Sequence, residues 1–231
     1  MKKLVLDATN AVINLLFPET CCGCENILNS NEKNICAICL ATLPKTNWQN
    51  FKGNPLEKIF YARVPLNRAT SFLHFRKDSI TQNFLHNLKY NSQKQLGVML
   101  GYYFAYDLKK AVWANQIDAI IPIPLHPKKL KIRGYNQSTM LCIGISKGLK
   151  TSMDIKSLKR VKFTETQTKK DRAARQKNVS GAFTCKPFEY KNILLVDDVT
   201  TTGATFESAA NALLKSNPNC KINIATLAAA E

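Results

Sequence analysis

The chain has 231 residues, of which 45% are hydrophobic and 21% are charged, and its formal net charge is +17. This length allows one good hydrophobic core with room for a small appended module, and this composition excludes a disordered protein. No apolar run approaches the roughly 18 residues that cross a bilayer. We therefore expect no membrane span and a cytoplasmic location.

The positive charge is unevenly placed along the chain. Residues 126–177 hold fifteen Lys or Arg against three acidic residues. One interpretation is the solvated surface of a generic basic protein. The other is an electrostatic footprint for a polyanion, either nucleic acid or a phosphorylated small molecule. The sequence leaves both open.

The N-terminal part predicts a separate module. Apolar residues recur at helical spacing within residues 1–17, which predicts a short amphipathic helix lying on the rest of the protein. A polar stretch flanked by Pro44, Gly53 and Pro55 then predicts a boundary. We expect residues 1–45 to form the module and residues 55–231 to form the main domain.

Two cysteine pairs lie within that module. Cys21 and Cys24 form the first, Cys36 and Cys39 the second, and eleven residues separate the pairs. Two such pairs facing each other complete a tetrahedral site of four thiolates, which suits zinc in a structural role. Disulfides are the alternative, although cytoplasmic thiols are kept reduced. Cys22 is an alternative first ligand, so the register is open by one residue.

The rest of the chain predicts an α/β fold. Strands and helices alternate in its second half, which predicts a parallel sheet with ligands bound at the carboxyl ends of its strands. The expected strands are Ile59–Val64, Ala69–Phe75, Ala119–Ile121, Ser157–Val161, Asn192–Val196 and Ile222–Leu227. The expected helices are Ile80–Tyr90, Gln93–Trp113, Asn136–Lys150 and Thr205–Lys215, with a basic helical turn at Lys170–Lys177.

The most specific motif follows the apolar strand at 192–196. Asp197 and Asp198 end the strand, and a loop rich in Thr and Gly opens the next helix. Backbone N–H groups at a helix start form a cradle for a phosphate, and carboxylates accept hydrogen bonds from the vicinal hydroxyls of a sugar. The phosphate-binding candidates are Thr201, Thr202, Gly203, Ala204 and Thr205.

Two further segments are candidates for the same site. Pro122, Ile123 and Pro124 follow a predicted strand and lead into a loop with Lys128, Lys129 and Arg133. A second basic segment, with Lys169, Lys170, Arg172 and Arg175, would lie over the site as a mobile flap. The alternative for the first segment is an ordinary Pro-rich turn with solvated lysines, and the alternative for the second is a solvated charge run. Tyr135 and Phe163 could stack on nucleic-acid bases or pack in the core.

The loop resembles the phosphoribosyl-pyrophosphate signature of type I phosphoribosyltransferases. That resemblance implies their α/β fold, with Asp197 and Asp198 on the ribose hydroxyls and the Thr-Gly-x-Thr loop on the 5-phosphate. It also implies that residues 122–124 form the pyrophosphate loop, and that the ligand arrives as a Mg²⁺ complex. It does not identify a catalytic residue.

The combination of motifs resembles the ComF/ComFC competence protein family over nearly the whole chain. The N-terminal helix, the four-cysteine finger, the Pro-Leu-His-Pro segment at 124–127, Arg-Gly-Tyr-Asn-Gln at 133–137 and the Asp-Asp loop occur in that order. The resemblance implies handling of single-stranded DNA during natural transformation, beside a competence helicase or uptake channel at the inner face of the cytoplasmic membrane. An active phosphoribosyltransferase with an unknown acceptor is the alternative, and a partner-binding scaffold is a third.

Overall fold

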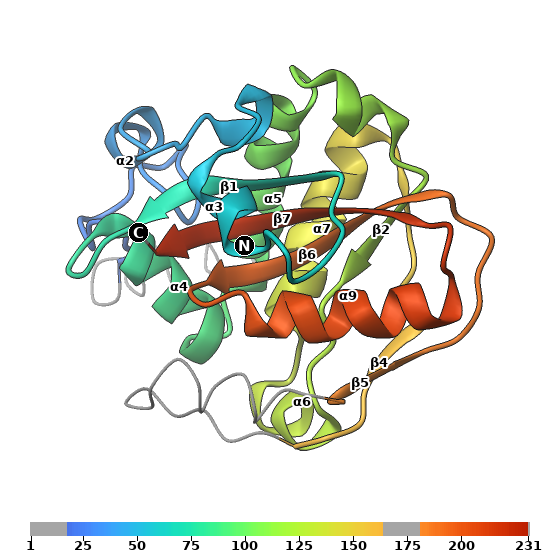
Figure 1. The fold of residues 1–231 in the computed structure, drawn as a ribbon. Helices are drawn as coiled ribbons and strands as arrows, with labels where there is room; N and C mark the ends of the chain where they lie inside the picture. Colours follow the sequence, from blue (N-terminus) through green and yellow to red (C-terminus); the bar gives the residue numbers. More distant parts are fainter. Residues whose placement is uncertain (1–17, 164–180, 231) are drawn as a thin grey trace.

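The computed structural model describes residues 18–163 and 181–230. Its centre is a five-stranded sheet in the order β1-β7-β6-β2-β3, and all neighbouring strands are parallel. This confirms the predicted α/β class with a parallel sheet (Figure 1). The strands are β1 (Arg68–Phe75), β2 (Ala119–Pro122), β3 (Ser152–Met153), β6 (Asn192–Thr200) and β7 (Lys221–Ala230).

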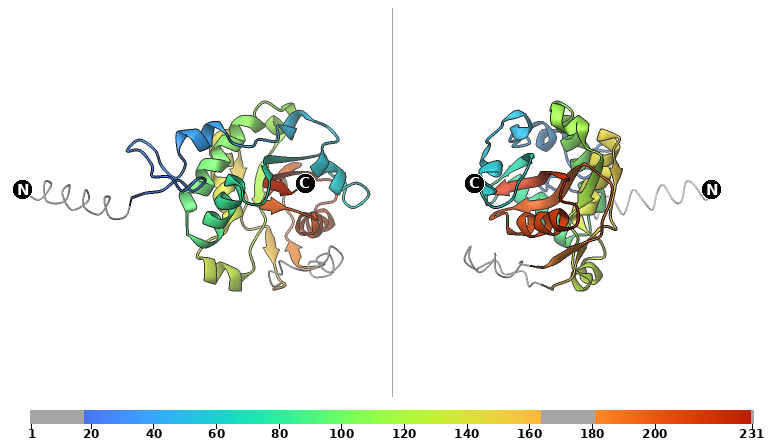
Figure 2. Two further views of the ribbon diagram at one scale, coloured as in Figure 1. Left: turned by 90° about the vertical axis from the view of Figure 1, so that its left-hand side faces the viewer. Right: turned by 45° about the vertical axis from the view of Figure 1, so that its right-hand side comes forward.

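Helices cover both faces of this sheet. One face is covered by α9 (Ala204–Ser216), and the other by α5 (Lys94–Leu108) and α7 (Gln137–Leu149), as Figures 1 and 2 show. The central strand β6 is apolar on both sides for this reason. Ile193 and Leu195 belong to the core beneath α9, whereas Leu194 and Val196 belong to the core beneath α5 and α7.

Helices α5 and α7 approach each other unusually closely. A Cβ atom at Gly101 would lie 2.2 Å from the Leu141 carbonyl oxygen, and one at Gly144 would lie 2.0 Å from the Val98 carbonyl oxygen. Only glycine fits at these positions, because the two backbones are in contact there. This close packing holds α5 and α7 together, and it thereby fixes the position of the start of α7 at the edge of the sheet.

Three smaller pieces flank the sheet. Strands β4 (Leu158–Arg160) and β5 (Phe183–Cys185) pair antiparallel in a separate two-stranded sheet. Helix α6 (Pro127–Arg133) has none of its residues buried. Helix α4 (Ile80–Tyr90) begins at its cap Ser79 and packs against α5 and β1. The remaining elements are α2 (Ala37–Ala41), η1 (Trp48–Asn50), α3 (Pro55–Ile59) and η2 (Val112–Gln116).

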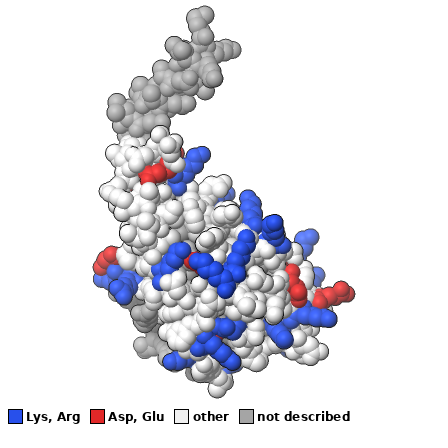
Figure 3. Space-filling model, turned by 90° about the horizontal axis from the view of Figure 1, so that it is seen from above, with Lys and Arg blue, Asp and Glu red and all other residues white. Residues whose placement is uncertain are grey.

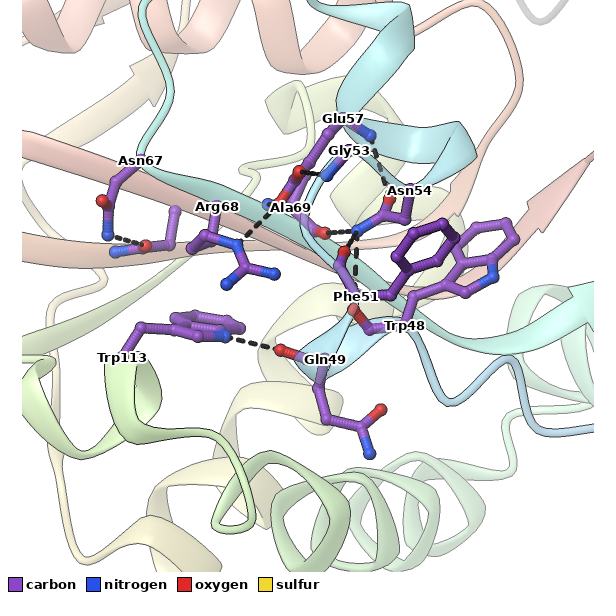
Figure 4. Close-up of polar contacts among 11 residues, drawn as sticks. Trp48, Gln49, Phe51, Gly53, Asn54, Glu57, Asn67, Arg68, Ala69 and Trp113 are labelled. Atoms are coloured by element: carbon purple, nitrogen blue, oxygen red, sulfur yellow. Dashed lines mark hydrogen bonds and ion pairs between the residues drawn. The ribbon is translucent and has the colours of Figure 1, made fainter.

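A polar network joins the segment 48–57 to the start of β1 (Figure 4). The Asn54 side chain donates to the carbonyl oxygens of Phe51 and Ala69, at 2.9 and 2.8 Å, and its oxygen caps α3. Glu57 accepts from Arg68 Nε at 2.7 Å. This segment is therefore tied to the sheet by buried side chains.

Five predicted elements differ from the structure. The strand expected at Ile59–Val64 is wrong: Ile59 ends α3, which the Asn54 cap and Pro55 start, and residues 60–64 form turns and a bend. The basic loop expected after Pro124 contains helix α6, because Pro127 starts a helix that Gly134 ends in the left-handed conformation. The helix expected at Gln93–Trp113 ends at Leu108 and is followed by η2.

Strand β7, expected at Ile222–Leu227, spans Lys221–Ala230. Strand β6 is also longer than predicted. It continues through Asp197 and Asp198 to Thr200, because pairing with β7 extends as far as Thr200 opposite Ala229. The two acids are therefore residues of the strand, not of the loop after it. The predicted helix within residues 1–17 and the basic turn at 170–177 lie outside the described residues. Among the described helices, none has the length and apolar character needed to span a membrane.

Candidate functional site

The four cysteines predicted as metal ligands come together in space. The Sγ atoms of Cys21, Cys24, Cys36 and Cys39 all lie within 4.8 Å of one another. The Cys24 and Cys36 sulfurs are 3.7 Å apart, close to the separation of about 3.8 Å that a tetrahedral site with Zn–S bonds of about 2.3 Å requires. The cluster could hold a metal ion, and its chemistry is consistent with structural zinc.

The structure resolves the register of this cluster. Cys21 belongs to it and Cys22 does not, because the four sulfurs that lie close together are those of Cys21, Cys24, Cys36 and Cys39. Backbone N–H groups of Gly23 and Cys36 donate to Cys21 Sγ at 3.4 and 3.3 Å. None of the eight cysteines, all of which the structure describes, forms a disulfide.

The cluster is attached to α4. The Asn83 side chain donates to the Gly23 carbonyl oxygen at 2.6 Å, and the Asn87 side chain donates to the Cys22 carbonyl oxygen at 3.2 Å. A Cβ atom at Gly23 would lie 3.0 Å from the Phe84 ring. The first cysteine pair and the helix that carries Lys89 are thus in direct contact.

The second candidate site lies at the carboxyl edge of β6. Asp197 Oδ1 accepts from Ser138 Oγ at 2.7 Å, and this serine stands in the first turn of α7. Asp198 Oδ2 lies 3.2 Å from Lys89 Nζ near the end of α4. Each acid therefore contacts a side chain from a helix that is distant from it in the sequence. Sequence reasoning missed both Ser138 and Lys89, because nothing local marks them.

The environment of Asp197 makes it a weak acid. Burial of the carboxyl group and the charge of Asp198 raise the pKa of Asp197 to about 7, although the Ser138 hydroxyl and the Lys89 charge act in the opposite direction. Two adjacent carboxyl groups resist double ionisation when they are removed from water. Cationic or hydrogen-bond-donating ligands would therefore bind well to this pair.

The loop after β6 has the backbone that the phosphate cradle needs. Gly203 has φ of +74° and is the N-cap of α9, without a side-chain cap bond. Because the first N–H groups of a helix have no partner within it, those at the start of α9 are available to a ligand. Thr201 is exposed and Thr202 and Thr205 are half-buried, whereas Gly203 and Ala204 are buried.

The predicted pyrophosphate loop lies beside β6. Pro122 ends β2, and the backbone N–H of Ile123 donates to the Val196 carbonyl oxygen at 2.8 Å. The Asn136 side chain donates to the Ile123 carbonyl oxygen at 2.9 Å and caps α7. Pro124 is half-buried. The structure thus places residues 122–124 next to the strand that carries the two acids.

Several basic side chains face this edge. Lys129 on α6 is half-buried, and this partial burial lowers its pKa, as do the positive charges of Arg160, Arg133 and Lys89. Burial also lowers the pKa of Arg160 on β4, against the attraction of Asp197. These four cations therefore share one region with Asp197, and sequence reasoning had missed Arg160. The predicted flap residues Lys169, Lys170, Arg172 and Arg175 lie outside the described residues.

The two aromatic candidates have different surroundings. Tyr135 is buried, and its hydroxyl donates to the Leu88 carbonyl oxygen. Phe163 is 42% exposed, with Lys128 Nζ 5.4 Å and Lys129 Nζ 5.9 Å from its ring centre. Phe163 is accessible to a base, whereas Tyr135 packs in the interior. The surface seen from above in Figure 3 carries many Lys and Arg side chains.

No protein-family model matches the chain. The chain is 28% identical to DNA utilization protein YhgH of Escherichia coli (strain K12) over 135 residues, which are 57% of this chain and 60% of that protein. It is 27% identical to competence protein F of Haemophilus influenzae over 213 residues, which are 86% of this chain and 92% of that protein. The match to the YhgH proteins spans about three fifths of their length. The chain is thus a homologue, at modest identity, of competence protein F and YhgH, which confirms the predicted relationship to the ComF/ComFC family.

Proposed function

We propose that this protein is a competence-type DNA-utilization factor that binds single-stranded DNA and carries a phosphoribosyl-pyrophosphate site. The names of its relatives, competence protein F and DNA utilization protein YhgH, support the first part. The observation that carries the second part is the acidic pair Asp197–Asp198, which leads directly into the Gly203 loop at the start of α9.

The proposed ligand has three parts that match three features of the edge. The ribose hydroxyls would donate to Asp197 and Asp198, and the 5-phosphate would accept from the N–H groups of residues 201–205. The pyrophosphate would lie by residues 122–124 among the cations Lys89, Lys129, Arg133 and Arg160. Mg²⁺ would arrive with the ligand, bound mainly by phosphate oxygens and waters.

Helix α6 and Phe163 are the proposed start of the DNA surface. Helix α6 carries Lys128, Lys129, Lys131 and Arg133 and has no buried residue, so its cations can follow a phosphate backbone. The exposed Phe163 ring beside Lys128 and Lys129 is a platform for one base. The proposed DNA surface would then lie next to the proposed phosphoribosyl site.

An active phosphoribosyltransferase is the second candidate. The cations around Asp197 favour it, because they would stabilise the charge that develops as pyrophosphate leaves. Turnover of phosphoribosyl pyrophosphate with a nucleobase or amine acceptor would establish it. Binding without turnover in such a screen would support a ligand-sensing role.

The cysteine module, proposed as residues 1–45, is a candidate docking surface for a competence helicase or uptake channel. Ile27 and Ile38 on this module are 67% and 73% exposed. Exposed aliphatic side chains of this kind contribute to protein interfaces. Replacing both with Ser tests the docking role, since neither substitution removes a metal ligand. Unchanged capture of a purified helicase would contradict it.

The direct test is fluorescence anisotropy of labelled single-stranded DNA over a salt series, with and without phosphoribosyl pyrophosphate and Mg²⁺. We expect log K to fall with log salt at a slope of about −0.7 for each phosphate contact. Phe163→Ala should weaken DNA binding roughly 5- to 100-fold, as loss of one base stack does.

The ligand site is tested separately with Asp197→Asn combined with Asp198→Asn. This variant should lose phosphoribosyl-pyrophosphate affinity by roughly 10-fold or more, since two charged hydrogen-bond acceptors are removed. Unchanged affinity would overturn the site assignment. DNA binding that disappears near physiological salt would overturn the DNA assignment and leave the transferase as the leading candidate.

A further inference from the structure

Arg63, which is distant in the sequence, contacts the backbone of the proposed phosphate loop (residues 201–205). Its Nη1 donates to the carbonyl oxygens of Ile59 and Thr202, both at 2.9 Å. Its Nη2 forms an ion pair with Glu207 in the first turn of α9. One guanidinium group therefore joins the end of α3, the loop and the helix that follows the loop.

The segment that carries Arg63 is shaped to meet the loop. Ala62 has φ of +59°, a left-handed conformation that is unfavourable for alanine, and it turns the chain immediately before Arg63. Strained backbone of this kind persists where surrounding structure holds it. A Cβ atom at Gly203 would lie 2.8 Å from Phe60 and 2.9 Å from Ile59. The loop and this segment are therefore in tight contact.

The contact to the Thr202 carbonyl has a direct consequence for Gly203. The peptide unit between them is planar and trans, so the Thr202 C=O and the Gly203 N–H point in opposite directions. When Arg63 holds the carbonyl on one side of the loop, the Gly203 N–H is turned to the other side. We propose that Arg63 is a positioning residue for the phosphoribosyl site, which aims this N–H at the 5-phosphate. This inference rests on the proposed function.

Arg63 also changes the charge seen by a phosphate. Glu207 lies in the first turn of α9, where a negative side chain opposes the binding of an anion at the helix start. The ion pair with Arg63 compensates that charge. Loss of Arg63 would therefore both release the carbonyl and remove the Arg63 charge from beside Glu207. The two effects are separable, because Glu207→Gln removes only the second.

The structure offers a matched control. Arg68 forms an ion pair of 2.7 Å with Glu57, and its side chain is 16% exposed, compared with 20% for Arg63. Arg68, drawn in Figure 4, begins β1 opposite Asn223 at the amino ends of the strands, whereas the loop follows the carboxyl end of β6. Arg68→Met removes a comparable buried pair without touching Thr202. It measures how much of any effect is general destabilisation.

The experiment compares Arg63→Met, Arg63→Lys, Arg68→Met and the double variant Arg63→Met with Glu207→Gln. Phosphoribosyl-pyrophosphate affinity with Mg²⁺ is measured by titration calorimetry, together with thermal stability. We expect Arg63→Met to weaken binding roughly 10-fold or more, and Arg68→Met to leave binding within about 3-fold. The double variant should recover part of the loss, and Arg63→Lys should bind more tightly than Arg63→Met because it keeps the charge.

A second readout needs no ligand. Hydrogen exchange of the backbone amides at 201–204 should be faster in Arg63→Met than in Arg68→Met or the unaltered protein, because the released loop samples more conformations. If the unaltered protein binds no phosphoribosyl pyrophosphate, the proposed function fails, and the exchange rates alone decide whether Arg63 orders the loop. Equal affinity and equal exchange in Arg63→Met would overturn the inference.

Discussion

The four-cysteine cluster and the site at the edge of β6 are built in opposite ways. All four cysteines come from one stretch of nineteen residues, Cys21–Cys39, and two short knuckles bring their sulfurs together. The edge site takes Asp197 and Asp198 from β6 but their partners, Lys89 and Ser138, from α4 and α7. A local site can be identified from spacing, whereas an assembled site depends on the whole fold.

The largest expected effect concerns the local site. Cys24 is the least buried of the four ligands, so Cys24→Ser removes a sulfur with little loss of core packing. We expect bound zinc to be lost and unfolding free energy to fall by about 4 kcal/mol or more, as loss of a structural metal does. Zinc content is measured by elemental analysis and stability by denaturant titration. Cys22→Ser is the control and should keep the metal.

This variant also tests whether the two sites are independent. Phosphoribosyl-pyrophosphate affinity of Cys24→Ser should stay within about threefold of the unaltered protein if the sites do not interact. A larger loss would mean that the cysteine module holds α4, and with it Lys89, in place. The hydrogen bonds from Asn83 and Asn87 to the module are the contacts that would carry such coupling.

The second prediction addresses the assembled site. Gly203→Ala places a Cβ atom against Phe60 and Ile59 at a φ of +74°. We expect a loss of about 1–3 kcal/mol in stability and a marked loss of ligand affinity, with zinc content unchanged. Gly134→Ala is the matched control, because Gly134 has the same φ but nothing within 4 Å of the position that a Cβ atom would take. Equal stability and equal affinity in Gly203→Ala would contradict the close contact between the loop and residues 59–60.

The third and smallest effect is a pH dependence of stability and ligand affinity that Asp197 gives to the assembled site. The pKa of Asp197 is raised from 3.8 to about 7 by burial and by Asp198. The folded carboxyl group thus keeps its proton to higher pH than the unfolded one. This group therefore reduces stability progressively as pH rises from about 4 to about 7. Because ribose hydroxyls donate to the ionised form, ligand affinity should rise as pH increases through about 7.

Ser138→Ala sharpens that prediction. The Ser138 hydroxyl favours the ionised form of Asp197, so its removal should raise the Asp197 pKa and move the rise in affinity to higher pH. Calorimetric titrations at several pH values measure both curves. Titration of the ligand's own phosphates is the same for both proteins and cancels in the comparison. Coincident curves would show that Asp197 does not control binding.

The fold was largely predictable where elements are long and strongly patterned. Helix α4 has the predicted bounds Ile80–Tyr90, and the apolar run at 192–196 correctly predicted a strand covered on both faces. Short elements were missed for a physical reason: α3 and α6 depend on a cap and one proline, and they bury too few residues to show periodicity. The end of β6 was misplaced because β7 continues to pair with it beyond Val196.

By itself, the sequence determined the elements whose chemistry is local. Each cysteine pair, the acidic pair and the Thr-Gly loop are short segments of the chain. Their geometry therefore follows from short-range backbone preferences. Only the tertiary structure decided that Cys21 and not Cys22 joins the cluster, that Tyr135 is buried, that Lys89 and Ser138 meet the two acids of β6, and that Arg63 meets the loop. Those contacts join residues far apart in the chain, and they form only when the helices pack on the two faces of the sheet.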